Sequence, residues 1–409
     1  MTDAEVIVVG GGPAGASVAF ALARQGVDVL VLDRARFPRS KPCAEYLSPQ
    51  ASRILDDMGA LHSVERSGAA MLAGVRVRAP NGAVIAGDFV ASHGYRGYRD
   101  RGLSVRREVL DAILLDSARA AGARVLERTR VTDVLRGSGR VRGVRTLSDA
   151  GDSELRARCL VAADGLRSVV AHRLGLAHRV RGPRRLALVT HYTGVAEIGD
   201  QAEMHVENDG YVGIADVGGG VTTVSLVVAA SRSRELSHDR AAFLDAWIAR
   251  RAHLAPRFAN ATRVTPVVAT GPFASRARRA WAPGAALVGD AADFFDPFTG
   301  EGIYAALRGG ELLAASLYDA VSAPSERGAD AALASYDAAR RREFGGKWLV
   351  ERVIGAVVGS PSLINRAARN LAARKDLADL LIGVTGNFVP PHEIIRTGYL
   401  WNVFIGSPQ

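Results

Sequence analysis

The amino-terminal part of the chain alternates short apolar runs with a helical pattern. Residues 5–9 (EVIVV) and 27–32 (VDVLVL) are β-branched runs of the kind that form buried parallel strands. Residues 16–23 (ASVAFALA), between them, predict a helix of small residues that ends near Gly26. The pattern therefore predicts a strand–helix–strand unit at the start of an α/β fold.

Later regions have different patterns. Residues 71–90 and 186–229 contain alternating segments such as VRVR, which predict the strands of a mixed sheet. From about residue 345 the pattern is mostly helical, with Ile354 and Val358 among the apolar residues on one side. The chain therefore predicts a sheet-rich part in the middle and a helical part at the end.

The first predicted strand runs directly into a glycine-rich turn. Residues 10–15 (GGGPAG) fit the pattern G-x-G-x-x-G, and Asp33 follows the second predicted strand. Gly10 permits the tight turn, Gly12 lets the backbone approach a pyrophosphate, and Gly15 allows close helix–sheet packing. Free N–H groups at the helix start can bind phosphates, and Asp33 can accept hydrogen bonds from ribose hydroxyl groups. The motif predicts a dinucleotide site but does not distinguish FAD from NAD.

A second segment points to one of these cofactors. Residues 285–290 (AALVGD) predict a strand that ends in an acid, and Ile303, Leu307 and Leu317 predict the apolar face of a helix over 301–321. From the Gly-Asp dipeptide to the start of this helix, the chain resembles the flavoproteins of the para-hydroxybenzoate hydroxylase fold. In that family an N-terminal glycine motif holds the ADP half of FAD, and a later Gly-Asp motif holds its ribityl-pyrophosphate region. The resemblance implies FAD as the cofactor.

Two further segments resemble the same family. Residues 159–168 (CLVAADGLRS) resemble its Asp-Gly motif, and residues 105–111 (VRREVLD) resemble a helix start whose arginine, here Arg107, lies beside FAD. The strand expected over 123–131 would give a backbone contact to adenine. The resemblance implies these cofactor-binding residues: Gly10, Gly12, Pro13, Ala14, Gly15, Asp33, Arg34, Cys43, Ala44, Arg107, Val131, Asp164, Gly289, Asp290, Pro297, Gly300, Glu301, Gly302 and Ile303.

The resemblance also implies the fold class and its division into domains. We expect an α/β fold, with a Rossmann-like FAD-binding domain that is interrupted by an α+β substrate domain built on a mixed sheet. The expected parts are a discontinuous FAD-binding domain (1–70, 99–180 and 270–344), a substrate domain (71–98 and 181–269) and a helical C-terminal segment (345–409).

A cysteine-containing loop indicates a branch of this family. Residues 37–49 (FPRSKPCAEYLSP) and 299–303 (TGEGI) resemble the geranylgeranyl-reductase-like flavoproteins, which implies reduction of carbon–carbon double bonds by hydride transfer from reduced FAD. An aromatic-rich motif of those reductases is matched in residues 210–217 by Tyr211 alone. The substrate is therefore expected to be apolar, and isoprenoid, polyketide and other specialised-metabolite substrates all stay open.

The same loop and the predicted mixed sheet supply the candidate reactive residues. Cys43, Glu45 and Tyr46 are candidate catalytic residues, although Cys43 is as compatible with a small buried hydrophobe. Tyr211 and His191 are candidate substrate-binding residues on predicted strands, where a structural role for the histidine is the alternative. The spacing of the histidines predicts no metal site.

Other reactions fit the same fold. The main alternative is an NAD(P)H-dependent FAD monooxygenase, a hydroxylase or epoxidase of natural-product biosynthesis; a flavin halogenase and a non-catalytic binder are further alternatives. Halogenases of this fold need a lysine between the FAD motifs, whereas the chain has none between Lys41 and Lys347. No second glycine motif follows a strand, so we expect NADPH or NADH to bind transiently as the reductant.

Composition limits the setting. The chain has 409 residues, 48% of them hydrophobic, and two cysteines, which favours a globular cytoplasmic protein without a disulfide framework. It shows neither a signal peptide nor the run of about 18 apolar residues that a membrane span needs, so at most peripheral membrane contact is expected. The net charge is +10, and almost all of the basic residues are arginines. We expect these arginines to form a solvated surface rather than a nucleic-acid-binding site. A phosphate or carrier protein linked to the substrate stays open.

Overall fold

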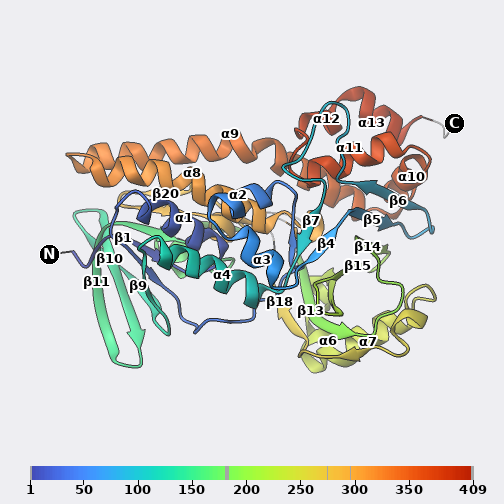
Figure 1. The fold of residues 1–409 in the computed structure, drawn as a ribbon, viewed down its shortest axis with the longest axis horizontal. Helices are drawn as coiled ribbons and strands as arrows, with labels where there is room; N and C mark the ends of the chain where they lie inside the picture. Colours follow the sequence, from blue (N-terminus) through green and yellow to red (C-terminus); the bar gives the residue numbers. More distant parts are fainter. Residues whose placement is uncertain (1, 180–183, 274, 295, 407–409) are drawn as a thin grey trace.

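The computed structural model describes residues 2–179, 184–273, 275–294 and 296–406, and Figure 1 shows how its elements are arranged. The first sheet lies near the N-terminus, the second sheet lies beside it, and the last helices gather next to the second sheet (Figure 1). These parts confirm the predicted fold class. The expected domain boundary at 180/181 lies outside the described residues.

The first sheet is mainly parallel and contains the strands predicted from the apolar runs. Its order is β20-β21-β11-β1-β2-β8, with β9 and β10 forming an antiparallel extension beside β11. The strands β1, β2, β11 and β21 are almost entirely apolar where they pair, because both faces are covered. The strands are β1 (Ala4–Val9), β2 (Val29–Leu32), β8 (Arg124–Leu126), β9 (Arg130–Gly137), β10 (Arg140–Ser148), β11 (Gly151–Ala162), β20 (Trp281–Ala282) and β21 (Ala285–Leu287).

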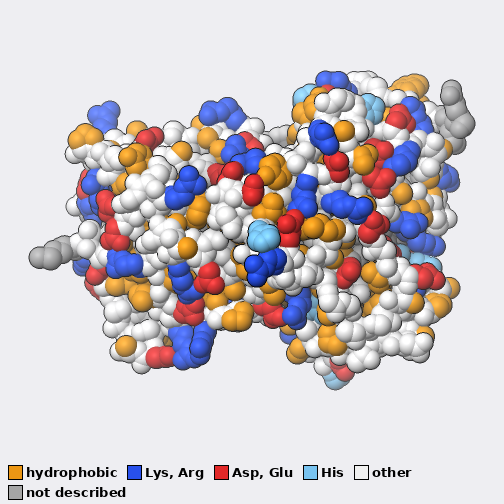
Figure 2. Space-filling view, viewed as in Figure 1, with side chains coloured by type: hydrophobic (Ala, Val, Ile, Leu, Met, Phe, Trp, Pro, Cys, Tyr) orange, Lys and Arg blue, Asp and Glu red, His pale blue; other side chains and the backbone are white. Residues whose placement is uncertain are grey.

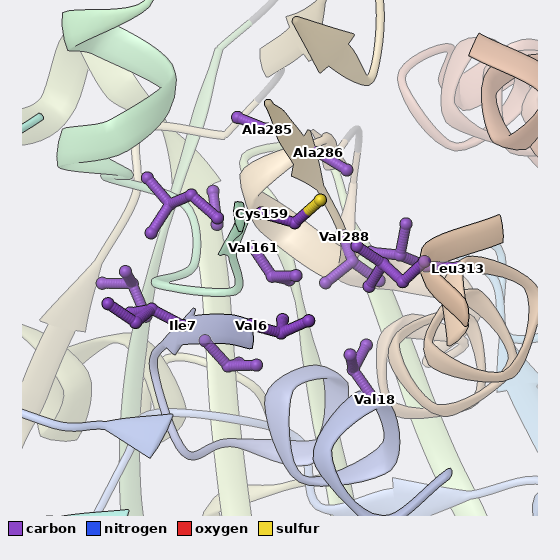
Figure 3. Packing of buried hydrophobic residues seen from close by; sticks show 14 of the residues in the cluster. Val6, Ile7, Val18, Cys159, Val161, Ala285, Ala286, Val288 and Leu313 are labelled. Atoms are coloured by element: carbon purple, nitrogen blue, oxygen red, sulfur yellow. The ribbon is translucent and has the colours of Figure 1, made fainter. Parts of the chain in front are cut away.

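Helices α1 and α8 pack closely beside this sheet. A Cβ atom at Gly310 of α8 would lie 2.5 Å from Oγ of Ser17 in α1, so the glycine is what allows this approach. The Ser17 hydroxyl donates a hydrogen bond to the carbonyl of Leu307 at 2.9 Å. Figure 3 shows Val18 of α1 and Leu313 of α8 among the buried side chains of the sheet. The helices here are α1 (Pro13–Ala23), α2 (Ala51–Asp57), α3 (Leu61–Arg66), α4 (Arg107–Ala120), α5 (Val169–Arg173) and α8 (Gly302–Ser322).

The second sheet is mixed, with the order β17-β13-β16-β15-β14-β5-β6 and β18 paired with β13. Side chains alternate along its strands: Leu188 packs toward α7, whereas Ala187 and Val189 face the opposite side. The strands are β5 (Gly74–Arg78), β6 (Val84–Asp88), β13 (Arg185–Thr193), β14 (Gln201–Glu207), β15 (Gly210–Asp216), β16 (Val221–Ala229), β17 (Thr262–Arg263) and β18 (Val268–Thr270), and the helices α6 (Ser233–His238) and α7 (Arg240–Ala249) lie beside them.

Two small sheets connect these parts, with the strand orders β3-β7-β4 and β12-β19-β22. The expected boundary between 70 and 71 falls inside β4, whose partner strand β7 also pairs with the loop segment β3. The strands are β3 (Tyr46–Leu47), β4 (Ala70–Leu72), β7 (Gly102–Ser104), β12 (Ala177–Arg179), β19 (Ser275–Ala277) and β22 (Asp293–Phe294).

The C-terminal helices cover one edge of the second sheet. Helix α9 (Glu326–Val358) is continuous, so the expected boundary at 344/345 lies within a helix. A Cβ atom at Gly87 of β6 would lie 2.5 Å from Cγ1 of Ile382, which shows how closely α11 docks on the sheet. The remaining helices are α10 (Pro361–Ala372), α11 (Lys375–Thr385), α12 (His392–Ile395) and α13 (Thr397–Phe404). Across the described ranges, no helix has the length and hydropathy needed to cross a bilayer.

The surface carries charges of both signs. Figure 2 shows lysine and arginine side chains interspersed with aspartate and glutamate over one face of the molecule. Many arginines form ion pairs, such as Arg99 with Glu65 at 2.7 Å and Arg124 with Asp28 at 2.8 Å. Exposed pairs of this kind add little stability individually.

Candidate cofactor and substrate site

A cavity of about 260 Å³ lies where the glycine turn, the start of α8, the second sheet and α9 meet. Segments far apart in the sequence thus meet at one site. The residues predicted from the sequence that line this cavity are Gly12, Pro13, Ala14, Cys43, Ala44, Glu45, Tyr46, Arg107, Tyr211, Gly289, Asp290, Pro297, Gly300, Glu301, Gly302 and Ile303. The cavity lining does not include Gly10, Gly15, Asp33, Arg34, Val131, Asp164 or His191.

The three motif glycines have different surroundings. Gly10 has a φ of +103°, and a Cβ atom there would lie 2.4 Å from the carbonyl oxygen of Ala163. A Cβ atom at Gly15 would lie 1.9 Å from the carbonyl oxygen of Gly10, so these two glycines fix the turn itself. At Gly12 the nearest atom would be Nη2 of Arg39 at 3.4 Å, and the residue lines the cavity. Gly12 is therefore the glycine whose missing side chain leaves room for a bound molecule.

The carboxylate of Asp33 binds backbone N–H groups of the glycine turn and of the loop after β2. Its two carboxylate oxygens accept hydrogen bonds from the backbone N–H groups of Gly11 and Ala35, each at 2.8 Å. Sequence reasoning did not assign Arg39, whose Nη1 lies 3.0 Å from Oδ2 of Asp111 beside the turn. The sequence feature that could have indicated Arg39 is its position as a basic residue in the loop after Asp33.

Arg107 reaches the cavity from the start of α4. Its guanidinium donates two hydrogen bonds of 2.8 Å to the carboxylate of Asp111. Burial disfavours the charged form, but the interactions with Asp111 and Cys43 outweigh burial and raise the pKa of Arg107. The site therefore holds a fixed positive charge next to the cysteine.

Glu45 connects the cysteine loop to the second sheet. The residue is buried and has a φ of +62°, which is uncommon for a residue with a side chain. Its Oε1 accepts the backbone N–H of Arg107 at 2.9 Å, and its Oε2 lies 2.7 Å from Nε2 of His191. His191 thus approaches the site through Glu45 rather than by facing the cavity. Its Nδ1 lies 3.0 Å from Oγ1 of Thr265.

Tyr46 is a lining residue of the cavity. Its hydroxyl is buried and has no hydrogen-bond partner among the described residues. Burial, followed by repulsion from Glu301, raises the pKa of Tyr46. A Cβ atom at Gly300 would lie 2.8 Å from Cδ1 of its ring, so the tyrosine packs directly on the turn before α8.

The Gly-Asp segment lies opposite the glycine turn. Gly289 has a φ of +62°, and a Cβ atom there would lie 3.0 Å from Cβ of Ala14. Asp290 lies 3.6 Å from Nζ of Lys41, which also lines the cavity. Asp164 instead accepts hydrogen bonds from the N–H groups of Val169 and Val170 at the start of α5. For that carboxylate the structure shows a capping contact.

Tyr211 is held by a carboxylate on the facing loop. Its hydroxyl donates a hydrogen bond of 2.6 Å to Asp296, whose other oxygen pairs with Arg185 at 2.5 Å. The ring of Phe298 packs edge-on against Tyr211 at a centroid distance of 5.0 Å. Tyr211 therefore lines the cavity with its ring, while its hydroxyl is already occupied.

The sequence patterns did not predict that one face of α9 lines the cavity. The cavity lining includes Arg340, Phe344, Lys347, Trp348 and Glu351. Their spacing of three and four residues puts them on one side of a helix. The sequence feature that could have indicated this face is the mixture of charged and aromatic residues at helical spacing. One of the chain's three lysines is among them.

A second cavity, of about 120 Å³, adjoins the first. It lies between β5, β6 and the C-terminal helices, and its lining is apolar apart from Thr299, Thr385 and Tyr399. Val75, Met204, Phe298 and Thr299 line both cavities. The two cavities therefore adjoin at these four residues, and the second cavity lies in the C-terminal part of the protein.

The residues present fit FAD. No described side chain caps the N-terminus of α1 or of α8, and both helix starts line the first cavity. Helix N-termini favour negative charge, as on a pyrophosphate or a reduced flavin. The open side of Gly12 and the cations Arg107, Arg39 and Lys41 lie around the same space.

Comparison with known proteins agrees with this geometry. The family described as "FAD binding domain" matches residues 3–348. The chain belongs to this family. It is an FAD-dependent oxidoreductase of the para-hydroxybenzoate hydroxylase fold, in the geranylgeranyl-reductase-like branch.

A relative and two solved structures illustrate the similarity. A digeranylgeranylglycerophospholipid reductase of Methanothrix thermoacetophila is 30% identical over 329 residues, which are 78% of each chain. The myxobacterial chondrochloren halogenase CndH is 26% identical, with a TM-score of 0.78 over 85% of this chain and 81% of its own. A geranylgeranyl bacteriochlorophyll reductase-like protein from Thermoplasma acidophilum is 23% identical, with a TM-score of 0.73 over 98% and 95%, and shows the shared fold.

Proposed function

We propose that this FAD-dependent oxidoreductase reduces a carbon–carbon double bond of an apolar, lipid-like substrate. The observation that carries the proposal is the second cavity, because an apolar lining next to the cofactor residues suits a substrate with a hydrocarbon tail. Burying each methylene of such a tail contributes about 0.8 kcal/mol. The reacting double bond would lie in the first cavity and the tail in the second.

The reaction named for the relative supports the same class. The Methanothrix thermoacetophila protein is named as a reductase of a digeranylgeranyl lipid, and it matches 78% of this chain. We carry over the reaction type and the apolar character of the substrate, while isoprenoid and polyketide tails both fit an apolar cavity. The substrate is compatible with an attached phosphate or carrier protein, as the sequence left open.

The chain's own residues would hold the cofactor and deliver a proton. FAD, once bound and reduced by NADPH or NADH, supplies a hydride. Gly12, Arg107 and the start of α1 would hold the pyrophosphate, and the start of α8 would stabilise negative charge on the flavin. The unpartnered hydroxyl of Tyr46 and the thiol of Cys43 are the loop groups that can donate a proton to the second carbon.

Product analysis tests this proposal. The FAD-loaded enzyme is incubated in air with NADPH and either geranylgeraniol, with isolated double bonds, or β-ionone, with conjugated ones, and the products are analysed by mass spectrometry. We expect a product that has gained two hydrogen atoms from at least one of these alkenes. A product that has gained an oxygen atom would instead establish the monooxygenase alternative, and a halogenated product formed in the presence of chloride would establish the halogenase alternative.

A further inference from the structure

The polar end of the first cavity is built by α9. Lys347 and Glu351 are four residues apart, so their side chains leave the same face of the helix, and both line the cavity. Nζ of Lys347 lies 3.4 Å from Oε1 of Glu301 and 4.5 Å from the ring centroid of Tyr304. Glu301 immediately precedes α8 and is itself buried.

The charges in this cluster do not balance. One ammonium group faces two carboxyl groups, and Lys347 pairs with Glu301. Glu351 forms no hydrogen bond or ion pair with the part of the chain that the structure describes. Burial, and then repulsion from Glu301, raise the pKa of Glu351 to about 8; Asp296 and Asp293 add to this, and Lys347 opposes it. Burial also raises the pKa of Glu301, but the paired Lys347 ammonium group opposes this, so Glu351 is the carboxyl group of the two that keeps its proton at neutral pH.

A protonated carboxyl group and an ammonium group are both hydrogen-bond donors. Two donors on one face of a cavity match an acceptor oxygen, and they stabilise best an oxygen that gains negative charge during the reaction. A pure hydrocarbon bound next to them would leave the Glu351 carboxyl group without a partner and the Lys347 ammonium group with Glu301 as its only ion-pair partner among the described residues, which is costly in a buried site.

We propose that Lys347 and Glu351 bind the carbonyl oxygen of an α,β-unsaturated carbonyl compound, so that the double bond to be reduced is conjugated to that carbonyl. This inference rests on the proposed function and narrows its substrate class. The apolar tail of the same molecule would lie in the second cavity.

The reaction balances with the groups already named. The alkene gains a hydride at its β-carbon. The two electrons come from NADPH or NADH, which is oxidised and acts through FAD. The electron pair of the double bond moves toward the carbonyl oxygen, next to the Lys347 ammonium group. Glu351 gives its proton to this oxygen, forming an enol and a carboxylate. The α-carbon then takes a proton from the Tyr46 hydroxyl or the Cys43 thiol, and that group regains a proton from solvent. The enol returns its proton to Glu351, which leaves the saturated ketone.

Binding of β-ionone, an apolar conjugated ketone, tests the proposal without turnover. Oxidised, FAD-loaded enzyme is titrated with β-ionone, and the dissociation constant and the position of the ketone's absorption band are measured from pH 6 to pH 10. A carbonyl that accepts strong hydrogen bonds shifts this band to longer wavelength. We expect the shift at pH 6, and we expect affinity to fall about tenfold as Glu351 loses its proton at higher pH.

Three variants separate the causes. Glu351→Gln keeps a donor but cannot ionise, so its affinity should not change with pH. Lys347→Met should weaken binding about tenfold and reduce the band shift at every pH. Arg352→Met, at an exposed position next to Glu351 in α9, is the control and should match the unchanged enzyme. Equal affinity and an unshifted band in all of these proteins would overturn the inference.

The proposed function is judged separately. If the product analysis shows reduction of geranylgeraniol while β-ionone binds without the band shift, the carbonyl site is wrong and the reductase stands. If neither alkene gains hydrogen, the reductase proposal fails, and the binding data still decide whether Lys347 and Glu351 hold a carbonyl.

Discussion

Nε2 of His191 lies 2.7 Å from Oε2 of Glu45, and this contact joins the second sheet to the loop that carries Cys43. Both side chains are buried, and the backbone of Glu45 has a positive φ. The other carboxylate oxygen of Glu45 accepts the N–H of Arg107. The pair therefore fixes the loop, the start of α4 and β13 relative to one another.

Removing one partner of this pair should destabilise the protein. In His191→Leu, Oε2 of Glu45 stays buried but loses its hydrogen-bond partner, and we expect the free energy of unfolding to fall by about 2 kcal/mol. Urea denaturation measures the loss. Glu45→Gln combined with His191→Leu should cost less than the sum of the single changes, because they remove one shared contact. Additive losses would show that the two residues act independently.

Gly12 and Gly15 should respond differently to alanine. In Gly12→Ala the new Cβ would have side-chain atoms as its three nearest neighbours, the closest being Nη2 of Arg39 at 3.4 Å, so the protein should fold but bind FAD at least about tenfold more weakly. In Gly15→Ala the Cβ would lie 1.9 Å from the carbonyl of Gly10, so both stability and FAD binding should be lost. Thermal unfolding and FAD released on ultrafiltration measure the two effects. Full FAD content in Gly12→Ala would contradict the assignment.

Glu203 should make stability depend on acid pH. Burial raises its pKa, but hydrogen bonds from His205 and Arg257 and the charge of Arg257 outweigh burial and lower it from 4.5 to about 2. The carboxylate therefore stabilises the fold above about pH 4.5, and this contribution of about 3 kcal/mol is lost as the pH falls toward 2. Unfolding of the protein and of Glu203→Gln should differ most above pH 5, and the difference should shrink below it. A constant difference would show that the carboxylate's charge is not what stabilises.

Filling the second cavity should discriminate between substrates by length. Ala367 of α10 lines this cavity, and Ala367→Phe would fill part of it. If the phenylalanine displaces three methylenes of a tail, the binding energy lost is about 2.4 kcal/mol, and kcat/KM for a long-chain alkene should fall roughly fiftyfold. A short-chain alkene should be unaffected. Ala356→Phe, at an exposed position of α9, is the matched control. Equal losses for both chain lengths would place the tail elsewhere.

Local sequence signals were sufficient for the cofactor motifs. The turn at Gly10 and the helix expected over 301–321, which is α8 from Gly302 to Ser322, follow from short-range patterns and from the resemblance. The contact between Glu45 and His191 spans 146 residues and depends on how the sheets meet, so no local pattern reveals it. The contact of Asp164, by contrast, is local, because its carboxylate accepts the N–H of Val169, five residues later, at the start of α5.

The part of the site on α9 was hidden for a different reason. A boundary was expected at 344/345, but the helix continues through it to Val358. Lys347 and Glu351 lie beyond this expected boundary, so the sequence pattern did not connect them with the FAD-binding segments. Their cavity-facing position depends on where α9 crosses α8, which tertiary packing decides.

Anaerobic oxidation of the reduced enzyme tests the central claim most directly. The FAD-loaded protein is reduced with dithionite, excess reductant is removed, and β-ionone or geranylgeraniol is added without oxygen while the flavin absorbance is followed. The proposed function predicts that the yellow colour returns with at least one alkene and that a product with two more hydrogen atoms appears in equal amount. If the flavin stays bleached with both alkenes until oxygen is admitted, the proposal that this protein reduces double bonds is contradicted.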